Sequence, residues 1–184
     1  MKSLLGRRVP GKRVVFGGLT AVLLAIVLFA GFHEYLYAIA WREFKGYQAE
    51  FVGLKVRLPL FWFKTDAQLF GQACIGRAYP SYLIDDPVIT AIPISPREVK
   101  GTDEEVLQRR QGYLSVLNKK TDGVKSATTL DIHSKAFTLY CTRDWIGRST
   151  TNLSCNAAKL PFILYYTGPN AIEPEAEAIF SSFE

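Results

Sequence analysis

The sequence predicts an α+β fold, in which an N-terminal transmembrane helix is followed by an antiparallel sheet packed with two or three helices. Three observations lead to this prediction. Residues 14–32 contain no charged side chain, residues 102–105 are typical of a helix start, and several segments after residue 50 alternate apolar with polar residues. Such alternation is typical of strands with one buried face, and strands grouped apart from helices are typical of α+β domains.

The basic residues 1–13 directly precede the uncharged stretch. As a helix, residues 14–32 would extend about 28 Å at roughly 1.5 Å per residue, close to the ~30 Å hydrocarbon core of a bilayer. No acidic residue precedes Glu34, so the positive-inside rule places residues 1–13 in the cytoplasm. We therefore expect a single-pass signal-anchor in the cell membrane, with the rest of the chain extracytoplasmic, in the periplasm if the source is Gram-negative.

A cleaved signal peptide is the alternative interpretation, because Ala38, Ile39 and Ala40 fit the small-x-small pattern of a cleavage site. The apolar stretch is longer than the roughly 7 to 15 residues usual in a signal peptide, which favours the anchor. With an anchor, residues 33–49 form a juxtamembrane stalk and residues 50–184 form one extracytoplasmic α+β domain.

The net charge of +5 gives no reason to expect a nucleic-acid partner. Five of the 22 lysines and arginines lie in residues 1–13, so residues 14–184 contain equal numbers of basic and acidic residues. Nucleic-acid binding usually requires a clustered basic surface. The membrane and a protein are the partners that the sequence favours.

The first half of the domain contains three predicted strands. Residues 54–58 alternate Leu, Val and Leu with Lys and Arg, and the aromatic residues 60–63 are predicted to fill the turn after them. The other two strands are residues 73–78 and residues 88–94. Pro93 places the latter at a sheet edge or ends it, because proline cannot donate to the ladder.

A helix is predicted over residues 102–118. Thr102 and Glu105 form a T-x-x-E capping box, and acidic residues occupy the first turn, where the helix dipole favours them. The apolar face of this helix consists of Val106, Tyr113, Leu114 and Leu117.

Four strands and a terminal helix are predicted to follow. The terminal helix begins near Pro174, which suits a first helical turn, and three glutamates lie near its start. Residues 131–135 are predicted to be a turn between two of the strands. The four strands are residues 124–130, 136–144, 150–158 and 162–167.

Three features of the domain point to a family. The opening strand runs into a proline and a tryptophan (VGLKVRLPLFWF), a helix lies in the middle, and the last strand leads to a terminal helix that ends in SSF. In these features residues 50–184 resemble the PsbP/Mog1-like family of α/β/α sandwich domains. The resemblance implies a binding, assembly or accessory role, and it brings no catalytic residues.

Two of the three cysteines lie in a predicted hairpin. If its strands pair symmetrically about Arg148, next to Gly147, Cys141 lies opposite Cys155 at a Cα separation of about 4.5 to 5.5 Å, within disulfide reach. Disulfides persist outside the cytoplasm. We therefore expect a Cys141–Cys155 disulfide, with Cys74 buried and outside it; three reduced core cysteines are the alternative.

Four tyrosines are the candidate binding residues. Tyr79 and Tyr82 lie in the predicted loop after residues 73–78, and Tyr165 and Tyr166 lie on the last strand. Tyrosine combines a large apolar area with a hydroxyl group and is common in binding surfaces. The same residues are compatible with half-buried positions in a sheet, so both interpretations stay open.

Motifs for catalysis and metal binding do not occur in the sequence. Two histidines and three dispersed cysteines do not match a zinc site, and there is no phosphate-binding loop. A turn explains Asp131, His133 and Ser134 better than a catalytic triad does. We therefore expect no enzyme activity, no metal and no cofactor.

The favoured function is a membrane-anchored, non-catalytic binding or assembly domain whose ligand or partner the sequence does not identify. The first alternative is an accessory subunit of a larger membrane protein complex. The second, less favoured, is a small hydrolase or thiol enzyme that uses Cys74 or His133.

Overall fold

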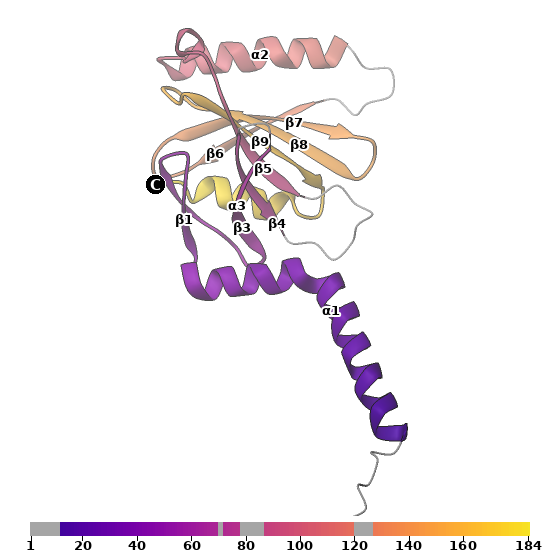
Figure 1. The fold of residues 1–184 in the computed structure, drawn as a ribbon. Coiled ribbons are helices and arrows are strands. Elements are labelled where there is room, and N and C mark those ends of the chain that lie inside the picture. Colours follow the sequence, from indigo (N-terminus) through magenta and orange to yellow (C-terminus); the bar gives the residue numbers. More distant parts are fainter. Residues whose placement is uncertain (1–11, 70–71, 78–86, 120–126) are drawn as a thin grey trace, which may run out of the picture.

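The computed structural model describes residues 12–69, 72–77, 87–119 and 127–184, and these residues form four helices and nine strands (Figure 1). The elements in chain order are α1 (Lys12–Lys45), β1 (Gln48–Phe51), β2 (Leu54–Arg57), β3 (Trp62–Leu69), β4 (Gln72–Arg77), β5 (Val88–Pro93), the 3-10 helix η1 (Pro96–Glu98), α2 (Asp103–Lys119), β6 (Thr128–His133), β7 (Thr138–Ile146), β8 (Thr150–Asn156), β9 (Phe162–Pro169) and α3 (Glu173–Ser181).

Strands β3 to β9 form one antiparallel sheet in the order β3-β4-β5-β9-β8-β7-β6. The strands β6 to β9 follow one another as a meander, and β9 then pairs with β5 in the middle of the sheet. Helix α2 connects β5 to β6, which is an edge strand. Strands β1 and β2 form a separate hairpin. The fold is therefore α+β, with helix α2 as the connection that carries the chain across the sheet.

The N-terminal helix corrects one part of the predicted fold. Helix α1 runs from Lys12 to Lys45, so the uncharged stretch is only part of a longer helix that also contains Glu34 and Arg42. In the part of the chain that the structure describes, no helix is long and apolar enough to cross a membrane. The predicted transmembrane helix over residues 14–32 is therefore contradicted, and the membrane anchor has no support.

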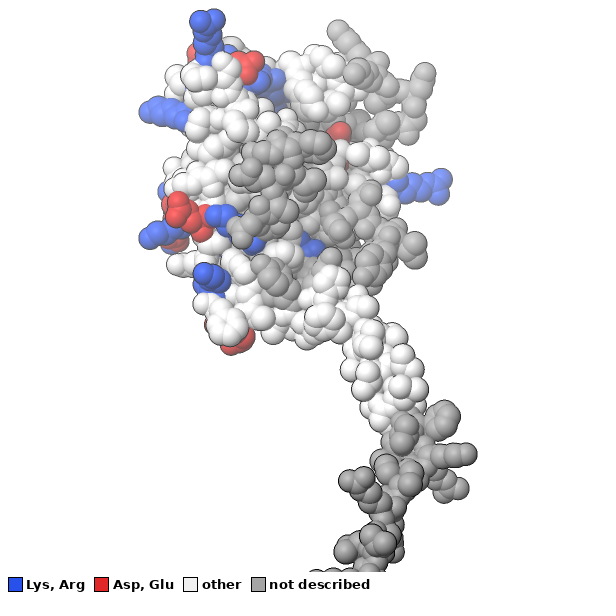
Figure 2. Space-filling view, viewed as in Figure 1, with Lys and Arg blue, Asp and Glu red and all other residues white. Residues whose placement is uncertain are grey.

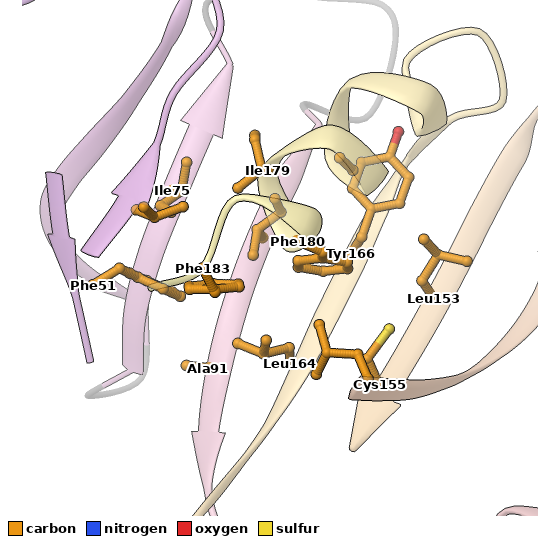
Figure 3. Packing of buried hydrophobic residues seen from close by; sticks show 14 of the residues in the cluster. Phe51, Ile75, Ala91, Leu153, Cys155, Leu164, Tyr166, Ile179, Phe180 and Phe183 are labelled. Atoms are coloured by element: carbon orange, nitrogen blue, oxygen red, sulfur yellow. The ribbon is translucent and has the colours of Figure 1, made fainter. Parts of the chain in front are cut away.

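The sheet lies between two helices, with α2 on one face and α3 on the other (Figure 1). Alternate residues of the strands point toward α3, and this face is apolar. The core residues from the sheet include Ile89, Leu139, Leu153 and Leu164, each fully buried. From α3 and the residues after it, Ala176, Ile179, Phe180 and Phe183 fill the space against them (Figure 3).

Charged side chains on α3 tie the helix to the sheet. The guanidinium of Arg143 on β7 pairs with the carboxylates of Glu173 and Glu177. At the other edge, Arg77 on β4 pairs with Glu175, whose Oε2 also accepts a 2.6 Å hydrogen bond from the indole nitrogen of Trp62. Because several of these groups are partly buried, the pairs fix how α3 lies on the sheet.

The predicted capping box at the start of α2 is confirmed. The backbone N–H of Glu105 donates to Oγ1 of Thr102 at 3.3 Å, and the Glu105 carboxylate accepts from the backbone N–H groups of Thr102 and Gly101. These bonds satisfy donors that would otherwise have no partner within the helix.

The predicted disulfide is present. Strands β7 and β8 pair symmetrically about the turn at Gly147, whose φ of 64° suits glycine, and the register places Cys141 opposite Cys155. The two cysteines form a disulfide with a Cα separation of 4.0 Å, somewhat closer than expected. Both are fully buried on the core face of the sheet. Cys74, also buried, lies outside this disulfide.

Several predicted elements differ from the observed ones. Residues 60–63 were predicted as a turn, but Trp62 starts β3, and neither β3 nor β1 was predicted as a strand. Residues 131–133 belong to β6 rather than to a turn, because Asp131 and His133 pair with Tyr140 and Thr138 of β7. The other boundaries differ by a few residues. Pro93 ends β5, which lies inside the sheet between β4 and β9.

Candidate binding groove

The face of the sheet that points toward α2, here called the outer face, is mostly polar. Side chains alternate between the two faces along each strand, so the outer face takes every second residue of β5 to β9. Where a helix packs on a sheet, these positions are normally apolar. The strand register aligns polar residues across neighbouring strands in two rows: Thr90, Tyr165, Ser154 and Thr142 in one, and Thr167, Asn152 and Asp144 in the other.

Helix α2 covers only part of this polar face. Its first half is fixed to the sheet, because Val106 is 2% exposed and the guanidinium of Arg110 pairs with Asp131 on β6. Farther along the helix, Tyr113 is 45% exposed and Val116 is 49% exposed. The second half of α2 therefore overhangs the sheet without packing closely on it (Figure 1).

A groove of about 240 Å³ lies between α2 and the outer face, and we call it the α2 groove. Small-molecule pockets usually measure roughly 300 to 1,000 Å³, so this groove suits a small ligand or a single side chain of a partner. Helix α2 contributes Arg109, Arg110 and Tyr113. The floor consists of Tyr140, Thr142, Ser154, Asn156, Ile163 and Tyr165.

The two arginines of the groove differ in their surroundings. Arg110 pairs with Asp131, and its guanidinium lies 5.4 Å from the ring centroid of Tyr140. Arg109 donates to the carbonyl oxygen of Glu98 at 3.4 Å, a long hydrogen bond. The ion pairs found among the described residues do not include Arg109. Arg109 is thus the cation that remains available to a ligand.

Two polar residues near the groove, Asp144 on β7 and Asn152 on β8, do not line it. Burial raises the pKa of the Asp144 carboxyl, and a hydrogen bond with Asn152 partly opposes this shift. Burial, and then the charge of Asp144, raise the pKa of Tyr113. The Asn152 Oδ1 atom is buried without a hydrogen-bond partner in the described part of the chain.

The structure separates the four predicted tyrosines. Tyr165 lies on the groove floor. Tyr166 faces the core: it is 0% exposed, its hydroxyl donates to the carbonyl oxygen of Pro169 at 3.0 Å, and burial raises its pKa. Tyr166 is therefore not part of the groove. Tyr79 and Tyr82 lie outside the described residues.

Of the nine residues that line the groove, only Tyr165 was predicted as a site residue; the other eight include Arg109, Tyr113, Tyr140 and Asn156. Their sequence patterns suggested ordinary roles, since Arg109 lies on a helix with several charges and Tyr113 lies on the apolar face of that helix. The pattern that could have indicated the groove lies in β8. Asn152, Ser154 and Asn156 occupy every second position there, so their side chains point to the same face of the sheet.

A second and larger hollow of about 690 Å³ lies where α1 and α3 end. Its basic residues are Lys45, Lys55, Arg57 and Lys135, and Lys135 pairs with Glu184. The helix dipole favours cations near a helix C-terminus, so these basic residues do not by themselves indicate a ligand site. On the face shown in Figure 2, basic and acidic side chains are interspersed and form no broad patch of one sign.

The residues considered for catalysis do not converge. Cys74 is 0% exposed, and the His133 ring lies beside the hydroxyl of Thr138 at 3.1 Å. Asp131 is engaged by Arg110, and the Ser134 hydroxyl bonds the backbone of Phe137. In residues 12–69, 72–77, 87–119 and 127–184, no group of three or more His, Cys, Asp or Glu side chains could hold a metal ion.

Comparison of the chain with protein-family models and with curated proteins gave no match. The PsbP/Mog1-like resemblance is not tested by these comparisons and stays a prediction.

Proposed function

We propose that this protein is a non-catalytic binding domain that holds a small polar ligand, or one polar side chain of a partner protein, in the α2 groove. The observation that carries the proposal is the composition of the outer face. A sheet face that served only to pack a helix would be apolar, as the core face here is.

The polar floor argues for binding rather than packing. Thr142, Ser154 and Asn156 offer hydroxyl and amide groups beneath an overhanging helix. The rings of Tyr113 and Tyr165 add the apolar area that ligand sites use for affinity. Ser154 and Asn156 are only partly buried, so their polar groups can stay hydrated when the groove is empty, and the free protein tolerates them at little cost.

The disulfide supports a location outside the cytoplasm. Cys141 and Cys155 are fully buried and joined, and such bonds persist mainly in oxidising compartments. An extracytoplasmic binding domain is therefore part of the proposal. The accessory-subunit and enzyme alternatives stay predictions, and no contact in the described residues favours either of them.

A binding screen tests the proposal. The full chain, labelled with ¹⁵N and kept in a non-ionic detergent because α1 exposes many apolar side chains, is titrated with monosaccharides and N-acetyl amino acids. We expect at least one compound to shift the amide signals of Arg109 to Tyr113 and of Ser154 and Tyr165. Replacing Ser154 by tyrosine fills the groove floor and should abolish these shifts.

The matched control is Ser149→Tyr, the same substitution in the exposed turn after β7. It should leave the shifts unchanged. If no compound perturbs the groove, or if compounds bind Ser154→Tyr as well as the wild type, the groove is not the binding site.

A further inference from the structure

We propose that the α2 groove recognises an anionic group, a carboxylate or a phosphate, through the guanidinium of Arg109. This inference rests on the proposed function and specifies the chemistry of the ligand.

The first step is the charge along the groove. No acidic side chain lines it, whereas two arginines do. The charge of Arg110 is already balanced by Asp131. The positive charge of Arg109 has no such counterpart among the ion pairs of the described residues.

The second step is the polarity of the groove. Arg109 lies near Asn156, since both also line a small adjoining cavity beside Ala157 and Leu160. A carboxylate or phosphate is therefore attracted to the part of the groove where Arg109 and Asn156 lie.

The third step is the geometry of the donors. A guanidinium presents planar N–H groups that match two oxygens of a carboxylate or phosphate. The Asn156 amide and the hydroxyl of Ser154 lie on the floor of the same groove and can donate to further oxygens. Phosphate and carboxylate share this chemistry, and separate titrations distinguish them.

The experiment titrates the ¹⁵N-labelled full chain with sodium phosphate, with sodium acetate and with sodium chloride at matched ionic strength. We expect saturable shifts of the Arg109 side-chain Nε–H signal and of the Asn156 amide with phosphate or acetate, and no saturable shift with chloride. A larger response to one of the two anions assigns the group.

Arg109→Gln should weaken the apparent affinity about tenfold, in line with the loss of a charge-assisted hydrogen bond. Arg109→Lys keeps the charge without the planar fork and should give an intermediate loss. The matched control Arg148→Gln, in the exposed turn after β7, should bind as the wild type does. Unchanged amide spectra away from the groove will show that each variant is folded.

Equal binding by Arg109→Gln and the wild type, or shifts that grow linearly with all three salts, would overturn the proposal. If monosaccharides, the neutral compounds of the screen, bind the groove while neither anion does, this inference fails and the proposed function stands. If neither the compounds of the screen nor the two anions bind, both this inference and the proposed function fail.

Discussion

Reducing the Cys141–Cys155 disulfide is expected to lower the free energy of unfolding by about 3 kcal/mol. The bond joins residues 14 positions apart, and in the chain-entropy model a closed loop of about 15 residues restricts the unfolded chain by roughly this amount. Urea unfolding followed by tryptophan fluorescence measures the change, because Trp62 is 2% exposed in the folded domain.

The double variant Cys141→Ala, Cys155→Ala is the control. It should lose at least as much stability, since the alanines also leave space in the core, and dithiothreitol should have no further effect on it. A wild-type protein whose stability is the same with and without dithiothreitol, after a peptide map has shown the bond to be formed and then reduced, would contradict the expectation.

Phe180→Ala is expected to cost about 3 to 5 kcal/mol, the range for phenylalanine removed from a close-packed core. Phe180 is 0% exposed and stacks on Phe183 at a centroid distance of 6.3 Å. It lies on α3 above the middle of the sheet, where little can move to fill the cavity (Figure 3).

The same urea measurement on Ile146→Ala supplies the comparison. Ile146 is 59% exposed at the end of β7, so its truncation should change stability by no more than about 0.5 kcal/mol. Similar losses for the two variants would mean that α3 does not pack on the sheet as described.

Local patterns explain what the sequence predicted well. The capping box marked the start of α2, and the symmetric hairpin about Arg148 gave the correct pairing of Cys141 with Cys155. In both cases the decisive residues are close in the chain, so spacing alone determines the contact.

Strands β3 and β6 show why other elements were missed. The aromatic residues 60–63 have no period of two, so β3 had no recognisable start. Asp131 and His133 resemble turn residues, but the carboxylate of Asp131 is bound by Arg110 on α2. That contact joins distant parts of the chain and is not visible in a local pattern. The uncharged run of residues 14–32 was misleading in another way. Its length, its lack of charge and the basic residues before it led to the transmembrane prediction, but it is part of the longer helix α1.

The candidate site was only partly predictable. Two neighbouring residues of a strand point to opposite faces, so Tyr165 and Tyr166 could not both line one groove, and the face of each depends on the register of β9. The groove itself depends on how far α2 overhangs the sheet. The apolar face predicted for α2 includes both Val106, which is 2% exposed, and Tyr113, which is 45% exposed, so the sequence pattern does not show where along the helix close packing ends.

Photo-crosslinking in the native cell tests the central claim, that binding takes place in the α2 groove, most directly. A benzophenone amino acid replaces Tyr113, which is 45% exposed at the groove, or Tyr47, which is 54% exposed beside the larger hollow. We predict that position 113 gives a discrete adduct that disappears when Ser154→Tyr fills the groove, and that position 47 does not. Equal adducts at both positions, or an adduct at position 113 that survives Ser154→Tyr, would contradict the claim.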